Sequence, residues 1–385
     1  MTIADRKQLR DETIDDTINA LYFKENDNPG RGSKMSWEKN VRKVVPYVAG
    51  EQPKEEKVIK LNTNECPYPP APGVQKLLQE FPIDRLRLYP DTNATKLADA
   101  LAKYYGIRPE EIFIGVGSDD VLGMSFLTFF HGDKPILFPD ITYSFYDVWA
   151  DLFGIPYKTC ALDENFRIKR EDYFQNNGGI ILPNPNAPTA ILEDTGVLEE
   201  IVAANPDSIV IIDEAYIDFG GKSMLPLIHK YDNLMVVQTF SKSRAMAGVR
   251  IGFAMANEKI IKYLKDVKES YNSYTMNMVS IEAGTAAVKD KAYFEDTINK
   301  VIKTREWTKD QLSQLGFRFT DSKSNFLFAT HEHVPAKEIF EALKQRHIYV
   351  RYWNKPRIDN YLRITIGTDE EMMQLCNALR EIILK

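Results

Sequence analysis

The stretch Asn233-Leu234-Met235-Val236-Val237-Gln238-Thr239-Phe240-Ser241-Lys242-Ser243 decides the fold of this chain. Its first half is a mainly apolar run, which predicts a strand buried inside a sheet. A serine and a lysine follow directly, and Arg250 comes eight residues after the lysine. Because open α/β sheets bind ligands at the carboxyl ends of their strands, we expect these polar side chains to lie at a ligand site.

Ser241, Lys242 and Arg250 together suit a ligand that carries both an aldehyde and a phosphate. A lysine amine condenses with a carbonyl group when its surroundings keep the amine partly uncharged. Serine and arginine bind phosphate, and arginine does so through two parallel hydrogen bonds. Pyridoxal phosphate has both groups. A solvated surface lysine at a strand end is the alternative, and this fragment alone leaves both interpretations open.

A second buried strand is predicted just upstream, in Ser208-Ile209-Val210-Ile211-Ile212, and it ends at Asp213. Such a continuous β-branched run is typical of a parallel sheet. A carboxylate at this edge can pair with a protonated pyridine nitrogen, and Tyr216 can donate a hydrogen bond to a ring oxygen. An aspartate that caps the following segment is the alternative.

Six segments of the chain occur in an order that resembles one family. They span residues 61–68, 117–120, 184–189, 213–219, 239–243 and 361–368. In this order they resemble the histidinol-phosphate aminotransferases, a class I/II branch of the fold-type-I enzymes that depend on pyridoxal 5'-phosphate. The resemblance implies an α/β fold with a large domain, whose central sheet is mainly parallel and flanked by helices, and a smaller C-terminal α/β domain.

The resemblance also assigns the residues around the cofactor ring. Lys242 is expected to bond to the cofactor aldehyde and to move a proton between the cofactor and the α-carbon of the substrate. Asp213 and Tyr216 match the partners of the ring nitrogen and the ring oxygen. Tyr143 matches the aromatic residue that stacks on the ring, although without the family pattern a core position would be favoured.

The glycine-containing turn at residues 115–117 opens a predicted helix, whose free backbone N–H groups form an anion site. The cofactor phosphate is expected to contact Ser118, the backbone of Asp119 and Asp120, Ser241 and Arg250. Two carboxylates beside a phosphate would repel it, so we expect both acidic side chains to point away or to cap the helix start.

Substrate contacts follow from the same resemblance. Arg363 matches the residue that binds the substrate α-carboxylate, for which the planar guanidinium group is well suited. Arg351 matches a residue that approaches the substrate phosphate, and a surface arginine on an edge strand is the alternative. Asn64 and Tyr68 are assigned to substrate binding. Tyr89 matches a tyrosine that reaches the partner's cofactor phosphate, which implies a homodimer with sites completed across the interface.

Two positions depart from the family pattern. Ala187 stands where the family usually has the asparagine that contacts the ring oxygen, and Ala190 replaces a glycine. We assign the ring-oxygen contact to Asn186, the nearest amide. Alanine tolerates a positive φ poorly, so Ala190 also calls the usual turn geometry into question.

Length and composition agree with a large two-domain enzyme. The chain has 385 residues, 44% of them hydrophobic, and a net charge of −6, which argues against a nucleic-acid partner. Three cysteines without a C-x-x-C pair suit a reducing, cytoplasmic location. No apolar run has the length of a membrane span. We expect no metal site, because the His331-x-His333 pair has no third ligand nearby.

Four regions are predicted along the chain. Residues 1–34 form an extension, residues 35–60 an arm that joins the small domain, residues 61–270 the large cofactor-binding domain, and residues 271–385 the small domain. Strand-like runs at 112–116, 135–138, 179–182, 209–213, 235–239 and 251–255 alternate with helical stretches, as in βα units. The chain near residues 37–47 is expected to complete the small domain.

The expected function is transfer of the amino group of histidinol phosphate to 2-oxoglutarate in histidine biosynthesis. An aromatic or broad-specificity amino-acid aminotransferase is one alternative. A threonine-phosphate decarboxylase on the same scaffold is another, because the sequence does not fix which substrate bond stands perpendicular to the ring. A cofactor-binding regulator without turnover is disfavoured, since no helix-turn-helix segment or basic arm is present.

Overall fold

A seven-stranded sheet organises the larger part of the molecule in the computed structural model, which describes residues 36–55 and 57–384. The predicted extension at residues 1–34 lies outside these residues. In spatial order the strands are β2 (Ile112–Gly115), β8 (Gly252–Ala256), β7 (Leu234–Thr239), β6 (Val210–Asp213), β5 (Gly179–Pro183), β3 (Ile136–Pro139) and β4 (Tyr157–Cys160). Strand β8 pairs antiparallel with both of its neighbours, β2 and β7, and all other pairings in the sheet are parallel. The prediction of a mainly parallel sheet is therefore confirmed.

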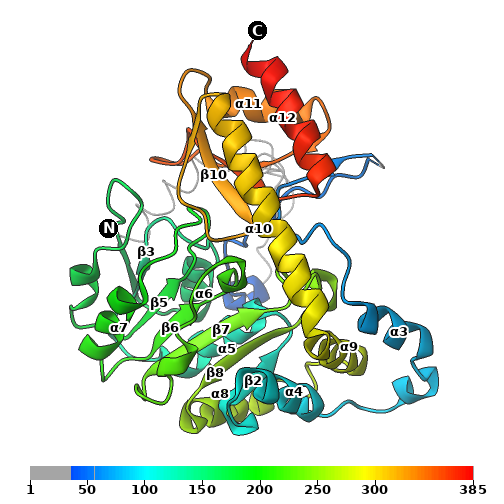
Figure 1. Ribbon diagram of the computed structural model, residues 1–385. Helices are drawn as coiled ribbons and strands as arrows, with labels where there is room; N and C mark the ends of the chain where they lie inside the picture. Colours follow the sequence, from blue (N-terminus) through cyan, green and yellow to red (C-terminus); the bar gives the residue numbers. More distant parts are fainter. Residues whose placement is uncertain (1–35, 56, 385) are drawn as a thin grey trace.

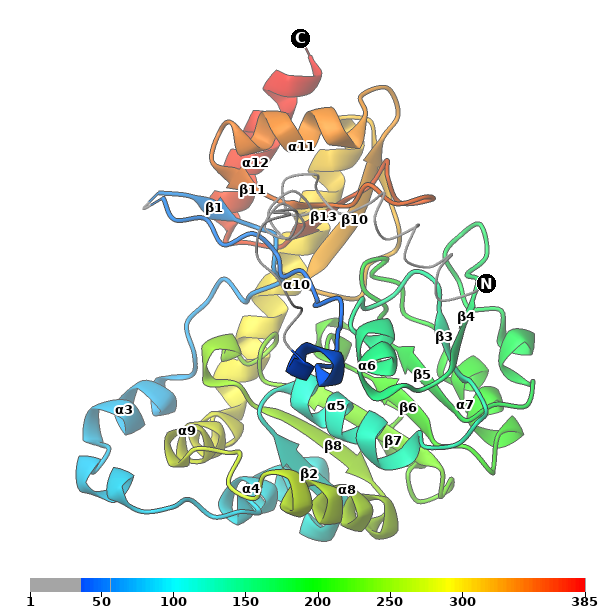
Figure 2. The ribbon, with the colours of Figure 1, turned by 180° about the vertical axis from the view of Figure 1, so that it is seen from behind.

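Helices cover both faces of this sheet. The helices are α3 (Pro72–Glu80), α4 (Thr95–Tyr105), α5 (Ser118–Phe129), α6 (Tyr146–Phe153), α7 (Thr195–Ala204), α8 (Glu258–Tyr271) and α9 (Met278–Lys289). Successive strand residues point to opposite faces. Ile211 therefore packs with α5, α6 and α8, whereas Val210 and Ile212 pack with α4, α7 and α9. Figures 1 and 2 show the sheet from its two sides.

A second, smaller sheet lies above the first in Figure 1. Its strands are antiparallel, in the order β12 (Arg351–Tyr352), β13 (Leu362–Thr365), β10 (Phe326–His331) and β9 (Phe317–Phe319). The helices α10 (Lys291–Gln314), α11 (Ala336–Lys344) and α12 (Asp369–Ile383) accompany it. A separate apolar cluster, which includes Ile298, Leu327 and Leu375, forms the core of this small domain.

The helical residues that lead from the large sheet to the small domain form two helices, α9 and α10, which are separated at Asp290. Val288 at the end of α9 packs in the core of the large sheet, whereas Phe294 at the start of α10 packs in the small-domain core. The change of core therefore occurs between these residues, and the division at residue 270 stays a prediction of domain organisation. Within the described residues, no helix is long and apolar enough to cross a membrane.

The N-terminal arm contacts both domains. Its first segment, η1 (Ser36–Asn40), lies beside α5 in Figure 2, and the ring of Tyr47 stacks on Phe145 of the large domain at 4.2 Å. Farther along, β1 (Ile59–Lys60) pairs in parallel with β11 (Ile348–Tyr349) of the small domain. The expectation that residues 37–47 complete the small domain is therefore wrong, because Tyr47 packs on an aromatic group of the large domain instead.

Candidate active site

Two adjoining cavities lie where the carboxyl ends of the parallel strands face the small domain. The inner cavity, of about 170 Å³, reaches into the large domain, and the outer cavity, of about 450 Å³, is walled by the small domain and the arm. The two cavities share five of their lining residues: Thr63, Tyr143, Ala187, Tyr216 and Lys242. Lys242 is therefore placed at the junction of the two cavities.

Asp213 stands at the end of β6 and is buried in the wall of the inner cavity. Tyr146 donates a hydrogen bond from its hydroxyl to Asp213 Oδ2 at 2.8 Å, and the Ala215 amide donates to Oδ1 at 3.2 Å. Burial raises the pKa of Asp213 to about 6, although these bonds act to lower it. A carboxylate held in this way is ready to pair with a cationic ring nitrogen.

Lys242 lies three residues after the end of β7, and its side chain lines both cavities. Its Nζ donates a hydrogen bond to the Thr63 carbonyl at 3.2 Å and lies 5.8 Å from the ring centre of Tyr216. Asn64 has a left-handed backbone (φ 58°), and its Nδ2 donates to the Tyr216 hydroxyl at 2.9 Å. The residues predicted around the amine are thus brought together.

The phosphate-type site forms where α5 begins. Ser118, Ser241 and Arg250 all line the inner cavity, and Arg250 Nη1 donates to Ser241 Oγ at 3.3 Å. Gly252 on β8 permits this approach, because a Cβ atom there would lie 2.2 Å from the Ser118 amide nitrogen. The free N–H groups of the helix start, a hydroxyl and a guanidinium group together make an anion-binding hollow.

The two acidic residues of this helix start behave differently. Asp120 turns back and accepts a hydrogen bond from the Val116 amide at 2.8 Å, as expected for a helix-start carboxylate. Asp119 lines the cavity, accepts from the Tyr143 hydroxyl at 2.8 Å and pairs with Arg250 at 3.3 Å. Asp119 does not point away, because a tyrosine and an arginine hold it in the wall, but it stands in the first turn of α5, which is the other alternative expected for it.

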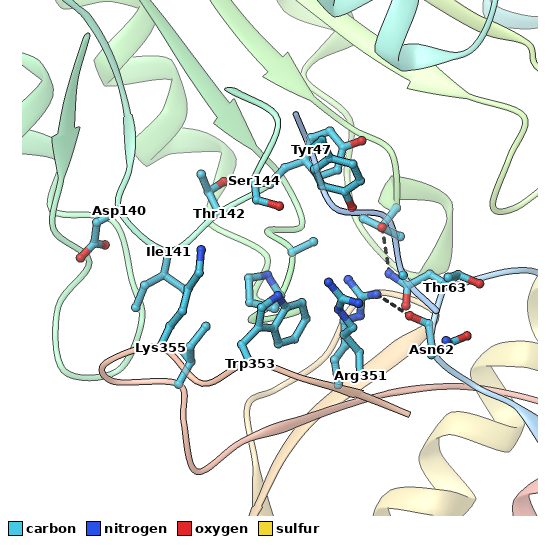
Figure 3. A pocket seen from close by; sticks show the side chains of 18 of the residues that line it. Tyr47, Asn62, Thr63, Asp140, Ile141, Thr142, Ser144, Arg351, Trp353 and Lys355 are labelled. Carbon is cyan, nitrogen blue, oxygen red and sulfur yellow. Dashed lines mark hydrogen bonds between the residues drawn. The ribbon is translucent and has the colours of Figure 1, made fainter. Parts of the chain in front are cut away.

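Two arginines of the small domain face the outer cavity. Arg351 and Arg363 lie directly opposite each other on β12 and β13, and both guanidinium groups contact the ring of Trp353, at 5.4 and 5.2 Å (Figure 3). Arg363 Nη2 donates to the Asn62 carbonyl at 2.8 Å, while its buried Nε has no partner among the described residues. Burial lowers the pKa of Arg363.

The charges of the two cavities differ. Among the residues that the structure describes, the outer cavity is lined by five basic side chains (Lys242, Arg351, Lys355, Arg357 and Arg363) and by one carboxylate, that of Asp140. Asp140 Oδ2 is already paired with Arg357 Nη1 at 3.0 Å. The inner cavity has three carboxylates and two basic groups. The outer cavity therefore suits anionic molecules.

Four predicted site residues do not line the cavities of this chain: Asp120, whose carboxylate turns back to the Val116 amide, and Asn186, Tyr68 and Tyr89. Asn186 is buried beneath them, where its amide bonds Ile141, Thr142 and Thr189, so the ring-oxygen contact assigned to it would break those bonds. Tyr68 packs on the small-domain core. Tyr89 is 80% exposed and lies against Tyr274, with ring centres 4.6 Å apart.

The two departures from the family pattern are accommodated without loss of the pocket. Ala187 lines both cavities, and Ala190 adopts the left-handed backbone (φ 63°) for which a glycine would be favoured. The Ala190 amide donates to the Asn186 carbonyl at 2.8 Å. The glycine turn geometry is therefore kept, at a cost on the order of 1 kcal/mol in backbone strain.

Several residues that line the cavities or support their walls were missed by the sequence analysis. Tyr146 was not selected, and nothing in its apolar surroundings indicates that its hydroxyl meets a carboxylate 67 positions later. Tyr47 enters from the arm, and Trp353 and Lys355 come from the loop between β12 and β13. The basic, aromatic composition of residues 351–357 was the one available signal.

Comparison with known proteins agrees with this geometry. Residues 56–379 match the family "Aminotransferase class I and II". The chain is 51% identical over 349 residues to histidinol-phosphate aminotransferase of Lactococcus lactis subsp. cremoris, covering 91% of this chain and 98% of the relative. It is 50% identical over 347 residues to that of Clostridium beijerinckii, covering 90% and 97%. The Sinorhizobium meliloti histidinol-phosphate aminotransferase, solved with pyridoxal-5'-phosphate, shares the fold (TM-score 0.78, 23% identity, 85% and 92% covered).

Proposed function

This chain belongs to the class I and II aminotransferases, and from that premise we propose that it transfers the amino group of histidinol phosphate to 2-oxoglutarate. Relatives with half of their residues identical over nearly their whole length are named for this donor. The observation that carries the proposal is the placement of Lys242 between an acid-containing inner cavity and a strongly basic outer cavity.

The cofactor of this reaction is proposed to be pyridoxal 5'-phosphate. The residues of the inner cavity fit its three functional groups: Lys242 its aldehyde, Asp213 its ring nitrogen, and Ser118, Ser241 and Arg250 its phosphate. Tyr143 supplies an aromatic face and Tyr216 a hydroxyl for the ring. When bound, this cofactor withdraws electrons from the substrate's α-carbon and so weakens the bond to its hydrogen.

The chain's own residues then divide the work. The Lys242 amine takes and returns the proton at the substrate α-carbon. Asp213 would be kept ionised by the protonated ring nitrogen of the cofactor and would accept a hydrogen bond from its N–H group. Arg363 orients a substrate carboxylate or phosphate, and its unpaired Nε adds a donor on that side. Because histidinol phosphate has no carboxylate, its phosphate is bound by the same arginine pair.

We also propose that the enzyme acts as a homodimer in the cytoplasm. Exposed apolar side chains occur on α3 and the segment after it, and at the end of α8 and just beyond it; they are Leu78, Ile83, Leu86, Leu88, Tyr89, Tyr271 and Tyr274. A surface of this kind favours a second copy of the chain, and Tyr89 is then directed toward the partner's site. The three unpaired cysteines suit a reducing compartment.

The test compares three donors with 2-oxoglutarate as acceptor: histidinol phosphate, phenylalanine and phosphothreonine. We expect kcat/KM to be highest for histidinol phosphate, with no release of carbon dioxide. Equal or faster transfer from phenylalanine would support an aromatic aminotransferase instead. Carbon dioxide released from phosphothreonine would support the decarboxylase.

A further inference from the structure

Apart from Lys242 at the junction and Arg357, which is paired with Asp140, the basic groups of the outer cavity lie in two separate places. Arg351 and Arg363 form the first, against one side of the Trp353 ring. Lys355 forms the second: Figure 3 shows it beside Ile141, with Trp353 between it and Arg351. A ligand that fills this cavity from end to end would therefore meet a cation at each end.

The loop that carries Lys355 is anchored to the large domain on its far side. Ile358 is buried among Ile141, Leu162 and Phe166. Arg357 donates to Asp140 Oδ2 at 3.0 Å and to the carbonyls of Leu162 and Asp163 at 3.0 and 2.6 Å. These contacts fix the backbone on which Lys355 stands and hold the loop over the cavity.

Lys355 keeps its charge available in this position. The only carboxylate that lines the outer cavity, Asp140, pairs with Arg357, and among the described residues no carboxylate lies within 4.0 Å of the Lys355 amine. The neighbouring wall of Ile141, Trp353 and Pro356 is apolar and lowers the local dielectric constant. An anion bound there would be attracted more strongly than in bulk water.

Resting on the proposed function, we propose that Lys355 binds the second carboxylate of a dicarboxylic 2-oxo acid and so determines the amino-group acceptor. Such an acid has two anionic ends, whereas histidinol phosphate has one. The arginine pair binds the first carboxylate and Lys355 the second. The donor places its uncharged imidazole against the apolar wall beside Lys355, so one cavity serves both substrates.

The test replaces Lys355 by methionine, which keeps the length of the side chain and removes its charge. In a two-stage transfer, kcat/KM for each substrate reports its own half of the reaction. We expect Lys355→Met to lower kcat/KM for 2-oxoglutarate on the order of ten-fold, the effect of one partly exposed charged hydrogen bond. The values for pyruvate, which has one carboxylate, and for histidinol phosphate should stay within about two-fold of the wild type.

Lys337→Met is the matched control, because Lys337 is exposed on α11 of the same domain, and its one ion pair among the described residues is with Glu341. Equal losses with 2-oxoglutarate and pyruvate, or a loss confined to histidinol phosphate, would overturn the role of Lys355. Calorimetric binding of glutarate and butyrate to the cofactor-loaded protein gives a second readout, and only glutarate should bind less tightly to Lys355→Met. If the wild type fails to use histidinol phosphate, the proposed function fails, while the glutarate result still decides the role of Lys355.

Discussion

The inner and outer cavities are built on different principles. In the inner cavity, acids and bases come from the edge of a parallel sheet and are bonded to one another, as Asp213 is to Tyr146 and Asp119 is to Arg250. In the outer cavity, four basic side chains come from an antiparallel sheet and its loop, and together with Lys242 they outnumber the lining carboxylates of the described residues five to one. The inner cavity is thus organised to hold one fixed molecule, and the outer one to attract exchangeable anions.

This difference teaches where specificity resides. A preorganised, hydrogen-bonded wall gives precise positions, which proton transfer at a single carbon requires. The guanidinium groups of Arg351 and Arg363, which lie against the Trp353 ring, can bind a phosphate or a carboxylate in the same place. Changes in the inner cavity should therefore affect every substrate alike, whereas changes in the outer cavity should distinguish among them.

The largest effect is expected from Lys242→Ala, at the junction of the two cavities. Removing the group that moves the proton should lower kcat at least about 10³-fold for all donors and acceptors. Steady-state rates with each substrate pair measure this effect, with the exposed Lys222→Ala variant as control. A variant that retained activity with any one pair would break the distinction between the cavities.

Arg363→Lys sharpens the comparison from the outer side. Lysine keeps the charge but loses the two parallel bonds of guanidinium, so kcat/KM for 2-oxoglutarate and histidinol phosphate should fall about 10- to 100-fold. The dissociation constant of the cofactor, measured by fluorescence quenching, should not change. Weaker cofactor binding in this variant would show that the two cavities are not independent.

Asp213→Asn tests the inner cavity without any ligand, through the free energy of unfolding of the cofactor-free protein. The pKa of Asp213 is raised from an ordinary 3.8 to about 6, so the buried carboxylate destabilises the folded state once it ionises. Above about pH 6 the asparagine variant should be more stable than the wild type by about 2 to 3 kcal/mol. This difference should shrink as pH falls and vanish below about pH 4, where both forms are neutral.

Urea unfolding at pH 8 and at pH 4 measures that difference. A stability gap of the same size at both values would contradict a raised pKa for Asp213. Activity should nevertheless fall in the variant at every pH, since an amide cannot hold a cationic ring nitrogen.

The smallest effect is expected from Arg357→Ala, which removes the bonds from the loop to the carbonyls of Leu162 and Asp163 and the ion pair with Asp140. The pair is partly exposed, with 37% and 28% of the two side chains accessible, so the free energy of unfolding should drop by less than about 1 kcal/mol. The released loop should raise KM for 2-oxoglutarate about two- to five-fold through Lys355, without lowering kcat. A lower kcat with unchanged KM would place Arg357 in the chemistry instead.

Much of the inner cavity could be predicted from the sequence because it depends on local pattern. The runs before Asp213 and Lys242 are buried strands, and two parallel neighbours must deliver both residues to one edge. Asp119 could not be oriented in advance, because its partner Arg250 lies 131 positions away. Strand β4 was missed because Lys158 and Thr159 are exposed on an edge strand without a buried run.

The outer cavity was less predictable, since it depends on how two domains meet. Asp140 and Arg357 are 217 positions apart, in loops that follow strands of different sheets. No pattern in either segment therefore indicates their contact. The same holds for Asn64, whose amide reaches Tyr216, while the amide of Asn186 is bonded to Ile141 and Thr189 instead. Family resemblance indicated Arg351 and Arg363. The structure was needed to place Trp353, Lys355 and Arg357, which lie between them in the sequence, at the cavity.

The most direct test of the central claim is the site of cofactor attachment. The protein loaded with pyridoxal 5'-phosphate is reduced with borohydride, digested and analysed by mass spectrometry. The account predicts that the added mass is found on Lys242 and is lost in Lys242→Ala. Attachment at another lysine, or an undiminished adduct in that variant, would contradict it.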